Sequence, residues 1–190
     1  MTLSTLLIRR GKSMHVKIIT IILTLCSLTS SGQFINEVTK DSLRTVICKM
    51  LSEDRRVRTE IVSIEIQKKV DSVQFYQLTM ITKMFGYPDK KRIGDSDCSV
   101  NPFLILIHNP DRLIEIENYE LYLAECRKGN IEGWELGLAF DRYYTHYLKK
   151  SMYGLYPQEK PCIEDFETVN RNRKGLNLKE LKRESFKACR

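Results

Sequence analysis

Three polar side chains occupy positions that a helical core would normally fill with apolar residues. Asp54 and Asp141 each interrupt a series of apolar residues spaced three and four apart, which is the spacing of one helix face. His108 closes the most apolar run of the chain, residues 103–107. Because an unpaired buried carboxylate costs several kcal/mol, each acid is expected to have a polar or charged partner.

One interpretation is that Asp54, His108 and Asp141 converge in a small polar pocket with Arg58 or Arg142. Arg58 lies one helical turn after Asp54, and Arg142 follows Asp141 directly. A carboxylate that orients an imidazole is a common arrangement for general base catalysis, and an arginine can bind an anionic group. One histidine and two distant aspartates are a weak ligand set, so no metal site is predicted.

The other interpretation is a buried structural network, in which a charge-assisted hydrogen bond ties helices together. The sequence contains no glycine-rich phosphate loop, no G-x-S-x-G, no H-E-x-x-H and no cofactor motif. We therefore favour a non-catalytic binding or structural module and predict no cofactor. The alternative is a small hydrolase with His108 as the base, oriented by Asp141 or Asp54.

The elements that must position these residues are helices, and no strand ladder is evident. Three-four spacing predicts helices over residues 41–61, 62–85, 111–127, 131–152 and 177–187. The Asn101-Pro102 start, followed by residues that are apolar all round, predicts a short helix over 103–107 that is central and buried. Irregular loops are expected near residues 87–101 and 153–175. In the second helix, the face predicted to be buried carries Ile66, Val70, Val73, Met80 and Met84, with Gln77 interrupting it. This pattern predicts an all-α bundle of five or six helices.

The first 32 residues have the pattern of a secretory signal peptide. Lys17 precedes an apolar run over residues 18–28, and small residues follow it. The run is shorter than the ~20 residues that span a bilayer, so no stable membrane span is expected after cleavage behind Gly32. Met14 is a possible true start, and a lipid anchor at Cys26 is the alternative localisation. The remainder, 33–190, is predicted to be one exported domain, periplasmic or secreted, with a basic C-terminal helix.

The positive charge of the chain is concentrated at its two ends. The net charge is +7 overall, with +4 in residues 1–32 and +6 in 171–190, which leaves −3 for residues 33–170. No interleaving of basic and aromatic residues accompanies it. A nucleic-acid partner is therefore not expected, and a protein or small-molecule partner stays open.

Six cysteines occur, and none forms a C-x-x-C pair. In an oxidising compartment one or two disulfides are possible. Cys48 and Cys126 lie in predicted helices and are interpreted as buried thiols. Cys98 and Cys162 lie in predicted loops and are the pair to test first for a disulfide.

Short motifs along residues 43–183 resemble a family of uncharacterised bacterial proteins, number 6624 in the series of domains of unknown function. They include the Asp54/Arg58 pair, the turn at residues 86–88, the apolar run ending at His108, and the pairs Asp141-Arg142 and Tyr153-Gly154. The resemblance implies that these are characteristic positions of the family, and it adds Tyr153 to Arg58 and Arg142 as a candidate ligand-binding residue.

The chain departs from the family pattern at four positions. Ile107 and Asn109 stand where the family has Gln and Ala, and Leu155 and Tyr156 stand where it has Thr and Gln. If residues 153–156 line an active site in the family, this chain is expected to have lost or altered that activity. The family has no known reaction, so the resemblance predicts none.

Overall fold

A computed structural model describes residues 32–94, 98 and 101–189, with side chains described from Lys40 onward. The predicted signal segment, including Met14 and Cys26, lies outside these residues apart from Gly32. The chain divides into two compact units, 1–39 and 40–190, and the description below concerns the second. The division of the whole chain into a signal and one domain stays a prediction.

The described residues are helical, as the spacing predicted. The elements are α2 (Gly32–Thr59), α3 (Ile64–Phe85), α4 (Lys90–Ile93), α5 (Phe103–His108), α6 (Pro110–Leu113), α7 (Ile116–Arg127), α8 (Gly133–Leu148) and α9 (Phe166–Gly175), with 3-10 turns at Ile163–Asp165 and Arg183–Ser185. Between residues 32 and 189, apart from the gaps near 95–100, extended pairing is limited to one isolated bridge of Cys162 with Lys187. The all-α prediction is confirmed.

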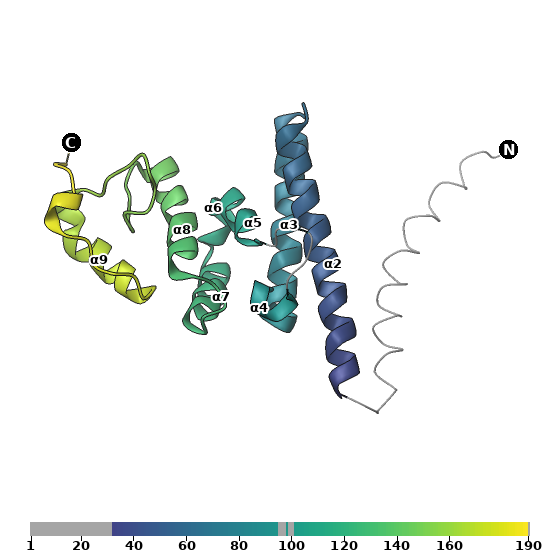
Figure 1. Cartoon of the computed structure of the whole chain (residues 1–190). Helices are drawn as coiled ribbons and strands as arrows, with labels where there is room; N and C mark the ends of the chain where they lie inside the picture. Colours follow the sequence, from purple (N-terminus) through teal and green to yellow (C-terminus); the bar gives the residue numbers. More distant parts are fainter. Residues whose placement is uncertain (1–31, 95–97, 99–100, 190) are drawn as a thin grey trace. The chain divides into compact units, whose positions relative to one another are not determined.

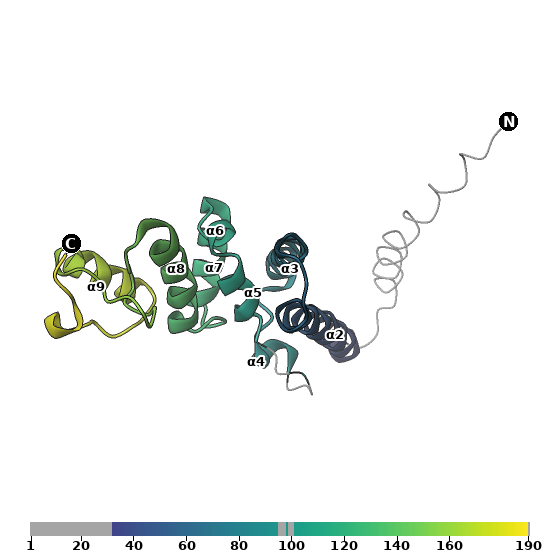
Figure 2. The same ribbon diagram turned by 90° about the horizontal axis from the view of Figure 1, so that it is seen from above.

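Helices α2 and α3 form a hairpin and lie side by side in both views (Figures 1 and 2). Ser63 begins α3, because its side chain accepts the N–H of Ile66 at 3.3 Å. Ile47 of α2 and Leu78 of α3 are fully buried, and the Gln74 amide donates to the carbonyl of Met50 at 2.6 Å. This packing brings the C-terminal end of α2 beside the N-terminal half of α3.

The prediction of which α3 face is buried is wrong. Ile66, Val73 and Met84 are 49%, 49% and 61% exposed, whereas the buried face carries Gln74, Phe75, Leu78, Thr79, Ile81 and Thr82. That face is more polar, but the Thr79 hydroxyl shares a hydrogen bond of 3.0 Å with Tyr122 Oη. Polar groups with such partners can be buried at little cost. A prediction based only on the spacing of apolar residues therefore assigned the wrong face of α3 to the core. Ile61, the last residue of the first predicted helix, lies beyond the end of α2 and is fully exposed.

Helix α5 lies between α3 and α8 (Figures 1 and 2). Ile105 and Leu106 are fully buried, which agrees with the predicted central position. The single helix predicted over 111–127 is broken into α6 and α7. The break is stabilised by Asn118, whose side-chain amide donates to the carbonyl of Arg112 at 2.9 Å.

The C-terminal predictions are corrected. Residues 166–175, predicted to be irregular, form α9, and the helix predicted over 177–187 is absent apart from the turn Arg183–Ser185. The Asn170 side chain binds both the N–H and the carbonyl of Leu181, at 2.8 and 3.2 Å. Lys187 exchanges backbone hydrogen bonds with Pro161 and Ile163. These long-range contacts satisfy the backbone groups that a helix would have paired internally.

The disulfide pairing also differs from the prediction. Cys48 pairs with Cys98 and Cys162 pairs with Cys189, with Cα–Cα distances of 5.8 and 5.1 Å. Cys98 and Cys162 therefore do not pair with each other, and the prediction that Cys48 is a free thiol is wrong. Cys126 is a buried free thiol, as predicted. Within the described residues, no helix combines the length and the apolar character needed to cross a bilayer.

Candidate functional site

Two helices and the end of a third bring four ionisable side chains together. Asp54 and Arg58 lie one turn apart near the end of α2, Asp71 lies on α3, and His108 is the last residue of α5. Arg58 Nη2 lies 2.8 Å from Asp71 Oδ1 and 3.4 Å from Asp54 Oδ1. Asp54 is only 3% exposed, so its charge depends on these partners. We call Asp54, Arg58, Asp71 and His108 the ionic cluster.

His108 is held from both ring nitrogens. Its Nδ1 lies 2.9 Å from Asp54 Oδ1, and its Nε2 lies 3.2 Å from Arg58 Nε. Arginine can only donate, so Nε2 must accept, and the proton of a neutral ring then resides on Nδ1 and is donated to Asp54. The Nε2 lone pair, which a general base would use, is therefore engaged by Arg58.

The ionic cluster also contains potential metal ligands. One donor atom each from Asp54, Asp71 and His108 lies within 4.8 Å of the others. The Arg58 guanidinium contacts all three residues and thus supplies the positive charge that a cation would bring. A metal ion would have to displace Arg58, so the donor set fits an arginine better than a metal.

Asp141, which was predicted to join His108, binds a different part of the chain. It lies on α8, is completely buried, and accepts five hydrogen bonds from residues 151–156. Oδ1 accepts the N–H groups of Met152 and Tyr153, and Oδ2 accepts those of Leu155 and Tyr156 together with the Ser151 hydroxyl, at distances of 2.7 to 3.3 Å. Asp141 is therefore an anchor for this loop, and the predicted three-residue convergence is wrong.

The other two sequence candidates also lie near this loop. Tyr153 is 3% exposed and packs its ring 5.7 Å from that of Phe140, while its carbonyl accepts Arg173 Nη1 at 2.6 Å. Arg142 is partly buried and takes no part in the hydrogen bonds of the ionic cluster or of Asp141 within the described residues. The departures at Leu155 and Tyr156 leave the anchor intact, because these residues bind Asp141 through their backbone.

Sequence reasoning missed Asp71 and Ser151. Asp71 follows Val70, which was assigned to the wrong face of α3. If the buried face had been centred on residues 74 and 78, Asp71 would have appeared one turn before it, at the level of Arg58. Ser151 carries no comparable signal, because only the fold of the loop brings its hydroxyl to Asp141.

Comparison with known proteins adds no relative. No family model, no curated protein and no solved structure matches this chain. The resemblance to the domain family of unknown function stays a prediction, and functional inference depends on the geometry alone.

Proposed function

We propose that the protein is a non-catalytic, disulfide-stabilised helical module of the cell envelope that acts by binding. The observation that carries the proposal is the hydrogen bond from Arg58 Nε to His108 Nε2 at 3.2 Å. It occupies the nitrogen that a hydrolytic base would need free. Asp141, the other acid proposed for catalysis, is saturated by its loop.

Two disulfides within the described residues support an exported location, because such bonds persist in oxidising compartments. N-terminal sequencing of the protein recovered from an exporting host tests this location. A mature chain that begins at Gln33 is expected. If mass spectrometry instead detects a lipid on Cys26, the protein is anchored to a membrane and is not released after cleavage behind Gly32.

A hydrolase with His108 as the base is the second candidate, because of one observation. Asp54 Oδ1 contacts His108 Nδ1 at 2.9 Å, which is the carboxylate–imidazole orientation used in water activation. Such an enzyme would require Arg58 to move away from Nε2 when substrate arrives.

Hydrolysis of an activated ester and of an activated phosphate diester distinguishes the two candidates. The protein is expressed from the full chain and recovered with both disulfides formed. Wild type, His108→Gln and His146→Gln are then compared, with exposed His146 as the matched control. Equal rates for all three are expected. A wild-type rate about tenfold or more above that of His108→Gln alone would contradict the proposal and establish the hydrolase.

A further inference from the structure

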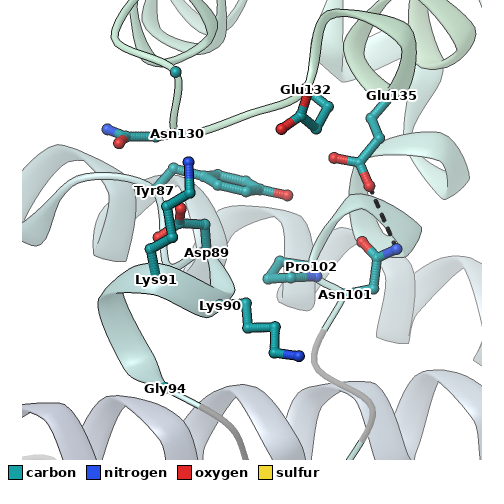
Figure 3. Close-up of a pocket in the computed structure, with 11 residues that line it drawn as sticks. Tyr87, Asp89, Lys90, Lys91, Gly94, Asn101, Pro102, Asn130, Glu132 and Glu135 are labelled. Atoms are coloured by element: carbon teal, nitrogen blue, oxygen red, sulfur yellow. Dashed lines mark hydrogen bonds between the residues drawn. The ribbon is translucent and has the colours of Figure 1, made fainter.

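A cleft of about 490 Å³ lies where the end of α3, α4, the start of α5 and the start of α8 meet. Figure 3 shows its main polar side chains. They are Tyr87, Asp89, Lys90, Lys91, Asn101, Asn130, Glu132 and Glu135. The volume suits a small molecule. The cleft is separate from the ionic cluster, since it shares no residue with it.

The hydroxyl of Tyr87 indicates that this cleft binds a ligand. Tyr87 is 2% exposed, and its buried Oη has no hydrogen-bond partner in the described structure. The residue is held firmly, because its N–H donates to Glu125 Oε2 at 2.8 Å. Figure 3 shows the hydroxyl pointing into the cleft, toward the side of Glu132 and Glu135. An unsatisfied buried hydroxyl costs about 1–3 kcal/mol, which a ligand that hydrogen-bonds it would recover.

Glu132 and Glu135 place two carboxylates on that same side. Glu132 directly precedes α8 and Glu135 lies in its first turn. The Asn101 side chain donates to Glu135 Oε1 at 3.5 Å, which is a long hydrogen bond. Burial raises the pKa of Glu135, and the nearby charge of Glu132 adds to this rise. A ligand cation would relieve both effects.

We propose that the cleft binds a small zwitterion of the amino-acid or short-peptide class, with its primary ammonium group at Tyr87, Glu132 and Glu135. An ammonium group has three N–H donors, and these residues supply three acceptors on one side of the cleft. Lys91 and Asn130 lie across the cleft, where a carboxylate would be matched (Figure 3). Asp89, which lies beside Lys91, uses its Oδ1 to accept the N–H of Arg92 at 2.9 Å. A metal ion is a poorer match, because among the described residues no third metal-binding side chain groups with Glu132 and Glu135.

Three probes with the same four-carbon chain test the ligand class by calorimetric titration. They are 4-aminobutanoate, 1-aminobutane and butanoate, added at up to millimolar concentration to the full chain with both disulfides formed. Saturable binding of 4-aminobutanoate is expected, with weaker binding of 1-aminobutane and no binding of butanoate. Butanoate binding as tightly as the amines, or none of the three binding, would overturn the proposal.

Two conservative variants test the residues. Tyr87→Phe removes only the hydroxyl, and Glu135→Gln removes only the charge. Each is expected to weaken 4-aminobutanoate binding about tenfold or more, equivalent to about 1.4 kcal/mol. Exposed Tyr76 and Glu117 provide the controls Tyr76→Phe and Glu117→Gln, which should bind like wild type. Tyr87→Phe removes an orphan hydroxyl, so its melting temperature should equal or exceed that of wild type. Unchanged affinity in both test variants would overturn the assignment.

This inference rests on the proposed binding role, but the two can fail separately. Hydrolysis that depends on His108 would overturn the non-catalytic role and leave the titrations unaffected. Absence of probe binding would remove the ligand assignment and leave the result for His108 as it stands.

Discussion

The hydroxyl of Ser151 donates to Asp141 Oδ2 at 2.9 Å, and Ser151 Oγ in turn accepts the N–H of Gly154 at 3.0 Å. Gly154 has φ 64°, a conformation that side chains disfavour, so the turn around the carboxylate requires glycine here. The relationship explains why an acid stands in the apolar series of α8. The carboxylate replaces the backbone partners that residues 151–156 lack.

Asp141→Asn is expected to destabilise the fold by roughly 3 kcal/mol or more. An asparagine presents an NH₂ group to backbone N–H donors, so at least two buried hydrogen bonds are lost and donors face each other. Urea unfolding measures the change. Asp111→Asn, at an exposed aspartate, should stay within about 0.5 kcal/mol of wild type. A stable Asp141→Asn protein whose amides 152–156 remain protected from hydrogen exchange would refute the anchoring role.

Peptide mapping of the oxidised protein is expected to recover the pairs Cys48–Cys98 and Cys162–Cys189. Chain-entropy arguments assign about 4 kcal/mol to a bond that closes a loop of 50 residues, so Cys48→Ser with Cys98→Ser should lower stability by up to that amount.

Cys126 provides the internal control for this map. Burial raises the pKa of its thiol and keeps reagents away, so iodoacetamide should modify it only after unfolding. Rapid modification of Cys126 in the native protein, or recovery of a Cys98–Cys162 peptide, would contradict the structure.

Acid is expected to destabilise the turn that follows α3 through Glu125. Burial favours a raised pKa for this carboxyl, but hydrogen bonds from Lys128, the Tyr87 N–H and Asn130 outweigh it and hold the pKa below 4.5. The folded state therefore binds its proton less readily than the unfolded state. The stabilisation is present above about pH 4.5 and is lost as pH falls through the folded-state pKa.

Glu125→Gln should thus cost about 1–3 kcal/mol at neutral pH and flatten the loss of stability below pH 4.5. Lys128→Met removes the partner that lowers the pKa of Glu125 most. Its loss of stability with falling pH should therefore be steeper than that of Glu125→Gln and shallower than that of wild type. Urea unfolding at several pH values measures these slopes. A Glu125→Gln protein with the full acid slope would show that other carboxylates are responsible.

The two faces of α3 are expected to respond differently to truncation. Leu78 is fully buried, so Leu78→Ala should cost about 2–5 kcal/mol. Val73 is 49% exposed, and Val73→Ala should change the unfolding free energy by less than about 0.5 kcal/mol. Equal losses at both positions would mean that the Val73 face is covered in the protein as it exists in solution.

The contrast at α3 shows where prediction from sequence ends. Its apolar three-four series correctly predicts a helix, because residues three and four apart lie on the same face of a helix. Which face is buried depends on helices distant in sequence. Gln74 and Thr79 lie inside because the Met50 carbonyl and the Tyr122 hydroxyl meet them there.

For the candidate site, the sequence by itself determined the local facts. It placed Asp54 and Arg58 one turn apart, put His108 at the end of a buried helix, and required a partner for Asp141, since a buried charge cannot stand alone. Only the tertiary structure determined which residues are the partners of these side chains. Asp71 and His108 reach Arg58 across 13 and 50 positions of sequence, and Cys48 reaches Cys98 across 50. Such pairings depend on the packing of whole helices against one another, and neither spacing nor composition within one helix specifies that packing.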